Sequence, residues 1–453
     1  MRTPRDNSRF DAKTACMSCR ASRQGSSRAE RSGLILVAVL WMLAVMTALV
    51  AVVGQTSRLN MKMAMATTDE VRCKWACRAG MEHAIGILNE DPKDSDCLMD
   101  LWSDNDEDFN DVVLERCRYS VRVSDEAGKL NINVATKDQL MALPYMEQDI
   151  ADAIVDWRDQ DDDPQPLGAE AGYYENLPIP YKIRNGPFKT VRELLQVKGV
   201  TEEKLYGEDI NCNGLLDANE RDGDLSPPPD DGDDYLDQGW IAYLTCYSYE
   251  RNVDAEGNDR ININQANQQQ LQDGLSLTAS QARWIVDNRG GGFQSIADLV
   301  NDRSPKAPSE NSGGNSNQAA PMDMQTFSQI ADRITITGEK KIPGRVNINT
   351  APVEVLLTLF GRDDQAEQIA RSIVADRAGL PYGFTSVAEL LNQSSVTVER
   401  FKSIVELVTV RSDVFTIRGL ATADVTGATF RIECVVDRST SPCTILYWHQ
   451  GAN

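Results

Sequence analysis

The chain has 453 residues, a formal net charge of −22 and an isoelectric point near 4.6. Its length allows about two to four small domains. So acidic a chain is repelled by the phosphates of nucleic acids, whereas it suits divalent cations. The histidines are His83 and His449 alone, and no Ser-His-Asp order, paired zinc ligands or phosphate-cradling glycine loop is present, so we expect no enzyme.

The N-terminal segment combines a basic leader with an apolar run. Residues 1–32 hold eight Arg or Lys against three Asp or Glu, and an uncharged run begins at Leu34. This run has about twenty residues, the length that a helix needs to cross a bilayer. It is longer than the apolar region of a secretory signal peptide. Because basic flanks stay in the cytoplasm, we expect a membrane anchor with an exported acidic body and C-terminus.

The junction between Gly33 and Leu34 resembles the leader of type IV pilins and type II secretion pseudopilins. The resemblance implies cleavage between Gly33 and Leu34 by a prepilin peptidase, followed by methylation of the new N-terminus. Those families usually carry a glutamate at the fifth mature position, which here is Ala38. The minor pseudopilin family called general secretion pathway protein K typically lacks that glutamate. An ordinary uncleaved anchor is the alternative.

Periodicity beyond the apolar run predicts one long helix and several strands. Residues 55–90 contain no proline, so we expect the helix to continue, amphipathic, to about Leu88, where Asp91-Pro92 stops it. Residues 112–124 alternate as strands do, and strand patterns return at 414–418, 429–436 and 444–448.

An internal repeat organises the middle of the chain. It reads Lys129-Leu-Asn-Ile-Asn-Val-Ala135, Arg260-Ile-Asn-Ile-Asn-Gln-Ala266 and Arg345-Val-Asn-Ile-Asn-Thr-Ala351. Each copy precedes a stretch with helical apolar spacing, then Phe-x-[Ser/Thr]-[Val/Ile] and a short helix. We expect an asparagine of the motif or a nearby polar group to cap the first helix of each copy.

The predicted fold class is therefore α+β. A pilin-like N-terminal transmembrane and amphipathic helix packs on a small antiparallel sheet, with a large helical insertion of helix-hairpin-helix-like repeats. The expected organisation is a prepilin leader (1–33), the transmembrane and amphipathic helix (34–90), the first part of the sheet (91–128), the first repeat (129–207), an acidic calcium-binding-like loop and strand (208–259), the second repeat (260–303), a linker (304–321), a connecting strand region (322–344), the third repeat (345–411) and C-terminal strands (412–453).

Two families share this repeat. One is the helix-hairpin-helix DNA-binding module of competence proteins, which depends on a Gly-x-Gly hairpin with basic neighbours. The hairpins here begin at Pro144, Leu275 and Gly361; none has Gly-x-Gly, and two carry acids. The other is the insertion of general secretion pathway protein K. Its signature stretch is similar to Asp156-Trp-Arg-Asp-Gln-Asp-Asp-Asp-Pro164, Gly168-Ala-Glu-Ala-Gly-Tyr-Tyr174 and Phe188-Lys-Thr-Val-Arg-Glu-Leu-Leu-Gln-Val-Lys-Gly-Val200.

The resemblance to protein K implies a minor pseudopilin at the tip of the type II secretion pseudopilus, which helps to initiate its assembly for export of folded proteins across the outer membrane. It implies a single-pass inner-membrane protein with its C-terminal body in the periplasm. The implied partners are minor pseudopilins of the I and J types, the major pseudopilin and the prepilin peptidase, with no nucleic acid. The alternatives are a membrane-anchored helix-hairpin-helix DNA-binding protein for DNA uptake and a calcium-dependent surface interaction protein.

Residues 209–220 match the twelve-residue EF-hand calcium loop at its diagnostic positions, including Gly214 at the sharp turn. We predict that this loop binds calcium in a structural role, through Asp209, Asn211, Asn213, the carbonyl of Leu215, Asp217 and Glu220. For a second acidic group we expect capping and solvation, with a metal site as the alternative; it comprises Asp159, Asp161, Asp163 and Glu170.

Of ten cysteines, Cys16 and Cys19 form a CxxC that we consider incidental. The other eight lie on the exported side, and an even number suits disulfides in an oxidising compartment. Proximity in sequence makes three pairs plausible: Cys97–Cys117, Cys212–Cys246 and Cys434–Cys443. Cys73 and Cys77 are expected to be simple helix residues.

Overall fold

A computed structural model describes residues 28–210, 212, 216–226, 228, 230, 232–300 and 322–452, with the backbone alone for 28–33, 224 and 452. The chain divides into two compact units, of which the second, residues 68–453, is here called the head. The first unit contains the apolar part of α1 (Arg28–Glu90).

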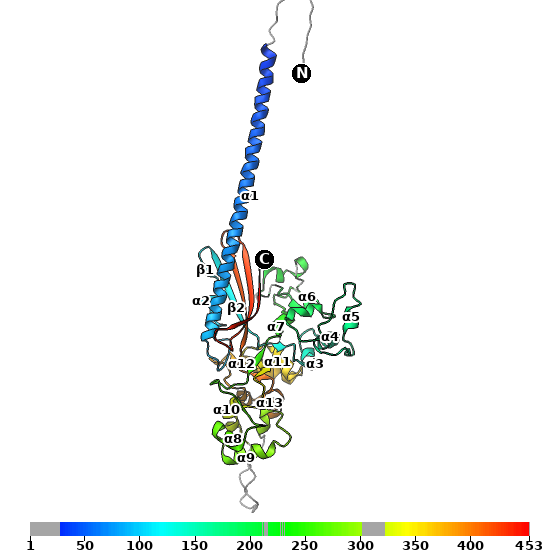
Figure 1. The fold of residues 1–453 in the computed structure, drawn as a ribbon, viewed down its shortest axis with the longest axis vertical. Helices are drawn as coiled ribbons and strands as arrows, with labels where there is room; N and C mark the ends of the chain where they lie inside the picture. Colours follow the sequence, from blue (N-terminus) through cyan, green and yellow to red (C-terminus); the bar gives the residue numbers. More distant parts are fainter. Residues whose placement is uncertain are drawn as a thin grey trace, which may run out of the picture. The chain divides into compact units, whose positions relative to one another are not determined.

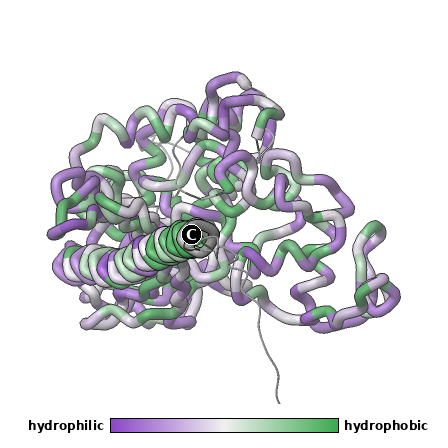
Figure 2. Tube along the Cα trace, turned by 90° about the horizontal axis from the view of Figure 1, so that it is seen from above, coloured by the Kyte–Doolittle hydropathy of each residue, from purple (hydrophilic) through white to green (hydrophobic). Residues whose placement is uncertain are grey.

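Helix α1 confirms the predicted apolar helix. Its segment from Leu34 onward is long and apolar enough to cross a membrane, with a mean hydropathy of 2.8 in its most apolar stretch. The large side chains of this stretch are exposed; Leu34, for example, is 77% exposed. Figure 2 shows the apolar end of the helix in green. The helix ends at Glu90, just before Pro92, because proline cannot continue a helix.

The head contains one antiparallel sheet in the order β1-β2-β11-β12-β13. Its strands are β1 (Val112–Leu114), β2 (Cys117–Asp125), β11 (Val414–Ala423), β12 (Thr429–Asp437) and β13 (Thr444–Ala452). Every second residue of β2 is buried, and the first four of these pack in one core with α1. The core contains Cys117, Tyr119, Val121 and Val123 of β2 and Cys73, Cys77, Met81, Ala84 and Leu88 of α1. The pilin-like packing of helix on sheet is therefore confirmed (Figure 1).

The strand pattern expected at 112–124 is confirmed, and it forms a hairpin of two strands. Residues Glu115 and Arg116 form a turn between β1 and β2, and Glu115 has a φ of 57°. The continuous alternation hid this turn because neither residue is glycine, asparagine or proline.

Residues 126–413, here called the insertion, lie between β2 and β11. Each repeat begins with one short strand and closes with a parallel partner: β3 (Leu130–Asn131) with β4 (Leu244–Thr245), β6 (Ile261–Asn262) with β7 (Ile334–Thr335), and β9 (Val346–Asn347) with β10 (Val408–Thr409). An antiparallel pair joins the segment between the first and second repeats to the segment between the second and third. Its strands are β5 (Tyr249–Arg251) and β8 (Lys341–Pro343).

The helices follow the same plan in each repeat. The first repeat has α3 (Lys137–Met141), α4 (Gln148–Arg158), α5 (Ala171–Tyr174), the 3₁₀ helix η1 (Val191–Gln196), α6 (Glu202–Tyr206), η2 (Ala218–Glu220), η3 (Gly223–Leu225) and α7 (Trp240–Tyr243). The second has α8 (Gln268–Leu275), α9 (Ala279–Asn288), η4 (Ile296–Leu299), α10 (Met324–Ile330) and η5 (Ala331–Arg333). The third has α11 (Val353–Phe360), α12 (Asp364–Arg377), η6 (Val387–Asn392) and α13 (Val398–Ile404); α2 (Asp106–Phe109) lies before the sheet.

The second asparagine of each motif ties its strand to the segment before the 3₁₀ helix. Asn349 accepts a hydrogen bond from the backbone N–H of Phe384 at 2.7 Å and donates to its carbonyl at 2.9 Å. Asn133 and Asn264 make the same two bonds to Phe188 and Phe293. Of the two expected kinds of cap, nearby polar residues cap the first helices of two repeats, Thr136 for α3 and Asn267 for α8, whereas α11 begins after Pro352 without a side-chain cap.

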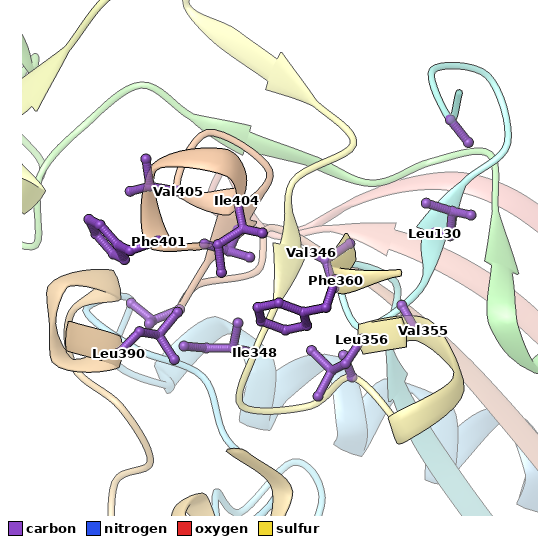
Figure 3. Close-up of a cluster of buried hydrophobic side chains, with 14 of the residues drawn as sticks. Leu130, Val346, Ile348, Val355, Leu356, Phe360, Leu390, Phe401, Ile404 and Val405 are labelled. Carbon is purple, nitrogen blue, oxygen red and sulfur yellow. The ribbon is translucent and has the colours of Figure 1, made fainter. Parts of the chain in front are cut away.

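An arginine at or just beyond the end of the second helix completes each repeat. Arg377 donates to the carbonyls of Ile348 and Ala351, and Arg158 and Arg289 bond the equivalent carbonyls of their own repeats. The three repeats then share one apolar core, whose third-repeat side chains are drawn in Figure 3.

The described cysteines are all thiols, so none of the three predicted pairs is bonded in the structure. Cys97 lies beside Asp100, with its Sγ 3.4 Å from Oδ1 of that residue. Cys117 lies instead beside Cys73, with 3.7 Å between the sulfur atoms. Cys73 is thus more than a simple helix residue.

Candidate functional site

The first candidate feature is the start of α1. Gly33 and Leu34 both lie within the helix, at the beginning of its apolar stretch. The sequence holds no acidic residue from Leu34 to Thr68, and the first one, Asp69, is buried in the head. One N-terminal apolar helix of this kind is consistent with a single-pass membrane anchor.

The second feature is the acidic loop predicted to bind calcium. Of its six proposed ligands the structure describes Asp209, Asp217 and Glu220; Asn211, Asn213 and Leu215 lie outside the described residues. Glu220 is only 1% exposed. Its carboxylate accepts a hydrogen bond of 2.9 Å from the backbone N–H of Asp217, within a capping box at the start of η2.

The electrostatics of this loop suit a cation. Burial is the main cause that raises the pKa of Glu220, and the neighbouring carboxylates of Asp217, Asp209 and Glu208 raise it further. Carboxylates crowded in this way repel one another, and a divalent cation bound among them removes the repulsion. The described acidic ligands therefore lie together and fit a hard cation.

The third feature lies where α4 ends, in the protein-K-like signature. Ligand oxygens of Asp156, Asp159 and Glu170 all lie within 4.8 Å of one another. Glu170 is 7% exposed, and among the described residues neither of its carboxylate oxygens has a hydrogen-bond donor. A buried carboxylate without a donor is costly, so this geometry fits a cation that the three groups would share.

The Gly-Ala-Glu motif builds this cluster. The backbone N–H of Ala169 donates to Oδ2 of Asp156 at 2.6 Å, and that of Gln165 donates to Oδ1 at 3.0 Å. Gly168 allows this approach, since a Cβ there would lie 1.8 Å from Oδ2 of Asp156. Glu170 follows directly and completes the group.

Burial raises the pKa of Glu170 to about 7, with Asp156 and Asp159 as further causes. The geometry of Asp159 and Glu170 therefore fits the alternative of a metal site better than capping and solvation. Asp161 and Asp163 lie apart in an exposed turn, where the N–H of Asp163 donates to Asp161. The sequence signal of this cluster is the pair Asp156 and Asp159, three residues apart, followed by the Gly-Ala-Glu motif.

Two segments of the chain match family models. Residues 125–206 and residues 346–411 each match a model described as type II secretion system protein K. These two segments are similar to protein K of the type II secretion system. The first match contains the acid cluster, and the second contains most of the third repeat.

Similarity to individual proteins is partial. The chain is 25% identical over 198 residues to an Escherichia coli (strain K12) protein named for protein K of the type II secretion system. The match takes in 38% of this chain and 59% of the length of that relative. A crystal structure of the GspK-GspI-GspJ complex from enterotoxigenic Escherichia coli aligns with a TM-score of 0.47 and 14% identity, covering 86% of this chain and 99% of that one.

Proposed function

We propose that this protein is a minor pseudopilin of a type II secretion system, at the tip of the pseudopilus, where it helps to initiate assembly for export of folded proteins. The observation that carries the proposal is the presence of two segments similar to protein K on a chain whose apolar helix has no acidic residue from Leu34 to Thr68. The role needs no catalytic residue.

The proposed location is the inner membrane, crossed once by α1, with the head in the periplasm. Basic residues precede Leu34, and the head is acidic, which supports this orientation. Before assembly, a prepilin peptidase would cleave between Gly33 and Leu34, and the new N-terminus would be methylated.

A tip position follows from the chemistry of residue 38. In the pilin families, a glutamate in the apolar segment is expected to pair with the terminal amine of a neighbouring subunit. Ala38 offers no carboxylate, so a further subunit cannot be held above this one in that way. The insertion, residues 126–413, also adds bulk to the head that would obstruct helical stacking.

The proposed partners are minor pseudopilins of the I and J types, the major pseudopilin and the prepilin peptidase. The exposed apolar side chains of α1 would pack against membrane lipid first and against the helices of other pseudopilins after assembly.

Removal of the gene from the organism that encodes it tests the proposed role. We expect folded exoproteins to accumulate in the periplasm, and we expect the intact chain to restore their export. A chain with Gly33→Val should not restore it, because the peptidase requires the small residue at the cleavage point. Undiminished export in the deletion strain would overturn the proposal.

We also propose that calcium binds as a structural cofactor at the 209–220 loop and at the Asp156, Asp159 and Glu170 cluster. The bound cation would neutralise buried carboxylates and so order the segments that carry them. Crowding around Glu220 and the donor-free oxygens of Glu170 support the two sites independently.

Isothermal titration of the protein with calcium separates these sites. We expect Glu220→Gln and Glu170→Gln each to remove one binding step. Glu203→Gln is the control, since Glu203 is exposed on α6 beside the loop. Calcium uptake that is unchanged by either variant would rule out that site.

A further inference from the structure

Two buried thiols connect the helix of the head to its sheet. Cys73 lies on α1 and is 0% exposed, and Cys117 is the first residue of β2 and is 1% exposed. Their sulfur atoms lie 3.7 Å apart, although 44 residues separate them in sequence. This is the distance of two thiols in van der Waals contact, and the sulfur atoms must approach to about 2.05 Å for a bond to form.

We propose that Cys73 and Cys117 form a disulfide in the mature protein. The proposal rests on the proposed function in one respect, since a head in the periplasm meets an oxidising environment. The sulfur–sulfur bond forms by exchange with the disulfide of a thiol–disulfide oxidoreductase. Both thiols of the head lose a proton, and the two electrons that they release reduce the disulfide of the oxidoreductase to two thiols.

The position of the pair indicates what the bond does. Buried residues of α1 begin with Asp69 and Cys73, directly after the end of the first unit. Asp69 already accepts a hydrogen bond of 3.0 Å from the hydroxyl of Thr426, in the loop between β11 and β12. The disulfide would fix the same part of α1 covalently to β2. Force transmitted along the apolar helix would then reach the sheet through a covalent bond as well as through packing.

The other cysteines of this core do not offer the same contact. Cys77 and Cys434 are buried in the same cluster, but among the described cysteines only Cys73 and Cys117 form a hydrogen bond between their sulfur atoms. Cys77 therefore provides a control of the same residue type, one helical turn away on α1.

The test uses the full chain, extracted from membranes after free thiols have been blocked with N-ethylmaleimide. Cleavage after glutamate releases residues 71–82 and 116–126. We expect mass spectrometry to find them linked without reductant and separate with it. Cys77→Ser should keep the link, and Cys73→Ser should lose it. We also expect reduction of the unaltered protein to lower its melting temperature by roughly 5–10 °C.

Two results would overturn the proposal. One is blocked Cys73 and Cys117 in the extracted protein, and the other is a link that uses Cys77 or another cysteine instead. The N-terminal mass of the same preparation reports on the proposed function separately. A chain that begins at Leu34 with both thiols blocked would refute the disulfide and leave the pseudopilin assignment standing. A chain that has the link between Cys73 and Cys117 but keeps its leader would support the disulfide and refute the pseudopilin assignment.

Discussion

Arg192 and Glu433 join the insertion to the sheet through two hydrogen bonds of 2.8 and 3.0 Å. Arg192 lies on η1 of the first repeat, and Glu433 lies on β12. Arg418 of the neighbouring strand β11 also donates to Glu433, at 3.3 Å. A planar guanidinium that meets a carboxylate with two parallel bonds fixes orientation as well as distance. This pair therefore helps to set how the first repeat lies on the sheet.

Loss of this pair should loosen the insertion. We expect Arg192→Ala to lower the free energy of unfolding by about 1–3 kcal/mol, because Glu433 is then left half-paired at a largely buried position. Urea denaturation at neutral pH measures the change. Arg283→Ala is the control, since Arg283 pairs with Asp287 at an exposed site of α9 and should cost less than about 0.5 kcal/mol. Equal costs for the two variants would contradict this role of Arg192.

The acid cluster predicts an unusual pH dependence. The folded pKa of Glu170 is about 7, above its ordinary value of 4.5, so the folded protein binds this proton more tightly than the unfolded chain. Without calcium, the stabilisation is complete below about pH 4.5 and is lost as the pH rises towards about 7, by at most about 3 kcal/mol. Glu170→Gln should therefore stabilise the calcium-free protein at pH 8.

Thermal unfolding with a chelator and with excess calcium measures this effect. Calcium should stabilise the unaltered protein at pH 8 and should help Glu170→Gln less. Glu175→Gln, an exposed position beside α5, should behave as the unaltered protein does. A Glu170→Gln variant that is less stable than the parent without calcium at pH 8 would contradict the prediction.

Two glycines of α1 should respond to alanine in opposite ways. A Cβ at Gly80 would lie 2.6 Å from the ring of Tyr119 and 2.7 Å from the side chain of Val121. A Cβ at Gly86 would have no such neighbour within 4 Å. We expect Gly80→Ala to destabilise the head by about 1–3 kcal/mol, since the helix must move away from β2. Gly86→Ala should stabilise it by about 0.5–1 kcal/mol through helix propensity alone. Chemical denaturation of both variants measures the difference, and a loss at both positions would contradict the packing.

The repeat asparagines should differ in importance according to burial. Asn349 is 1% exposed, whereas Asn264 is only partly buried. We expect Asn349→Ala to cost about 2–4 kcal/mol, because the N–H and carbonyl of Phe384 both lose a partner away from water. Asn264→Ala should cost less, since water can replace part of the loss. Their free energies of unfolding decide the order, and the reverse order would show that these bonds do not hold the repeats.

The sequence predicts the fold class well because its signals are local. The apolar run, the strand periodicity and the three Asn-Ile-Asn motifs each act within one element, and the helix, the sheet and the repeats are all present. The hydrogen bonds of the motif asparagines could not be predicted from the sequence, because their partners lie between 29 and 55 residues away. These partners are Phe188, Phe293 and Phe384.

Contacts between distant segments account for the other errors. Proximity in sequence suggested Cys97 for Cys117, but the packing of α1 on β2 brings Cys73 there. Likewise, Glu170 was expected to be solvated, but the chain returns at Gly168–Glu170 and places it beside Asp156, and both carboxylates are buried. The acids that share a cluster are therefore set by how residues 168–170 fold back against the end of α4, and not by the spacing of the acids in the sequence.

The N-terminal mass of the membrane-extracted protein, from cells with and without a prepilin peptidase, tests the central claim most directly. A minor pseudopilin should give a mature chain that begins at methylated Leu34, and this species should disappear when the peptidase is absent. An intact leader in both strains would contradict the pseudopilus role and would leave an ordinary anchored protein.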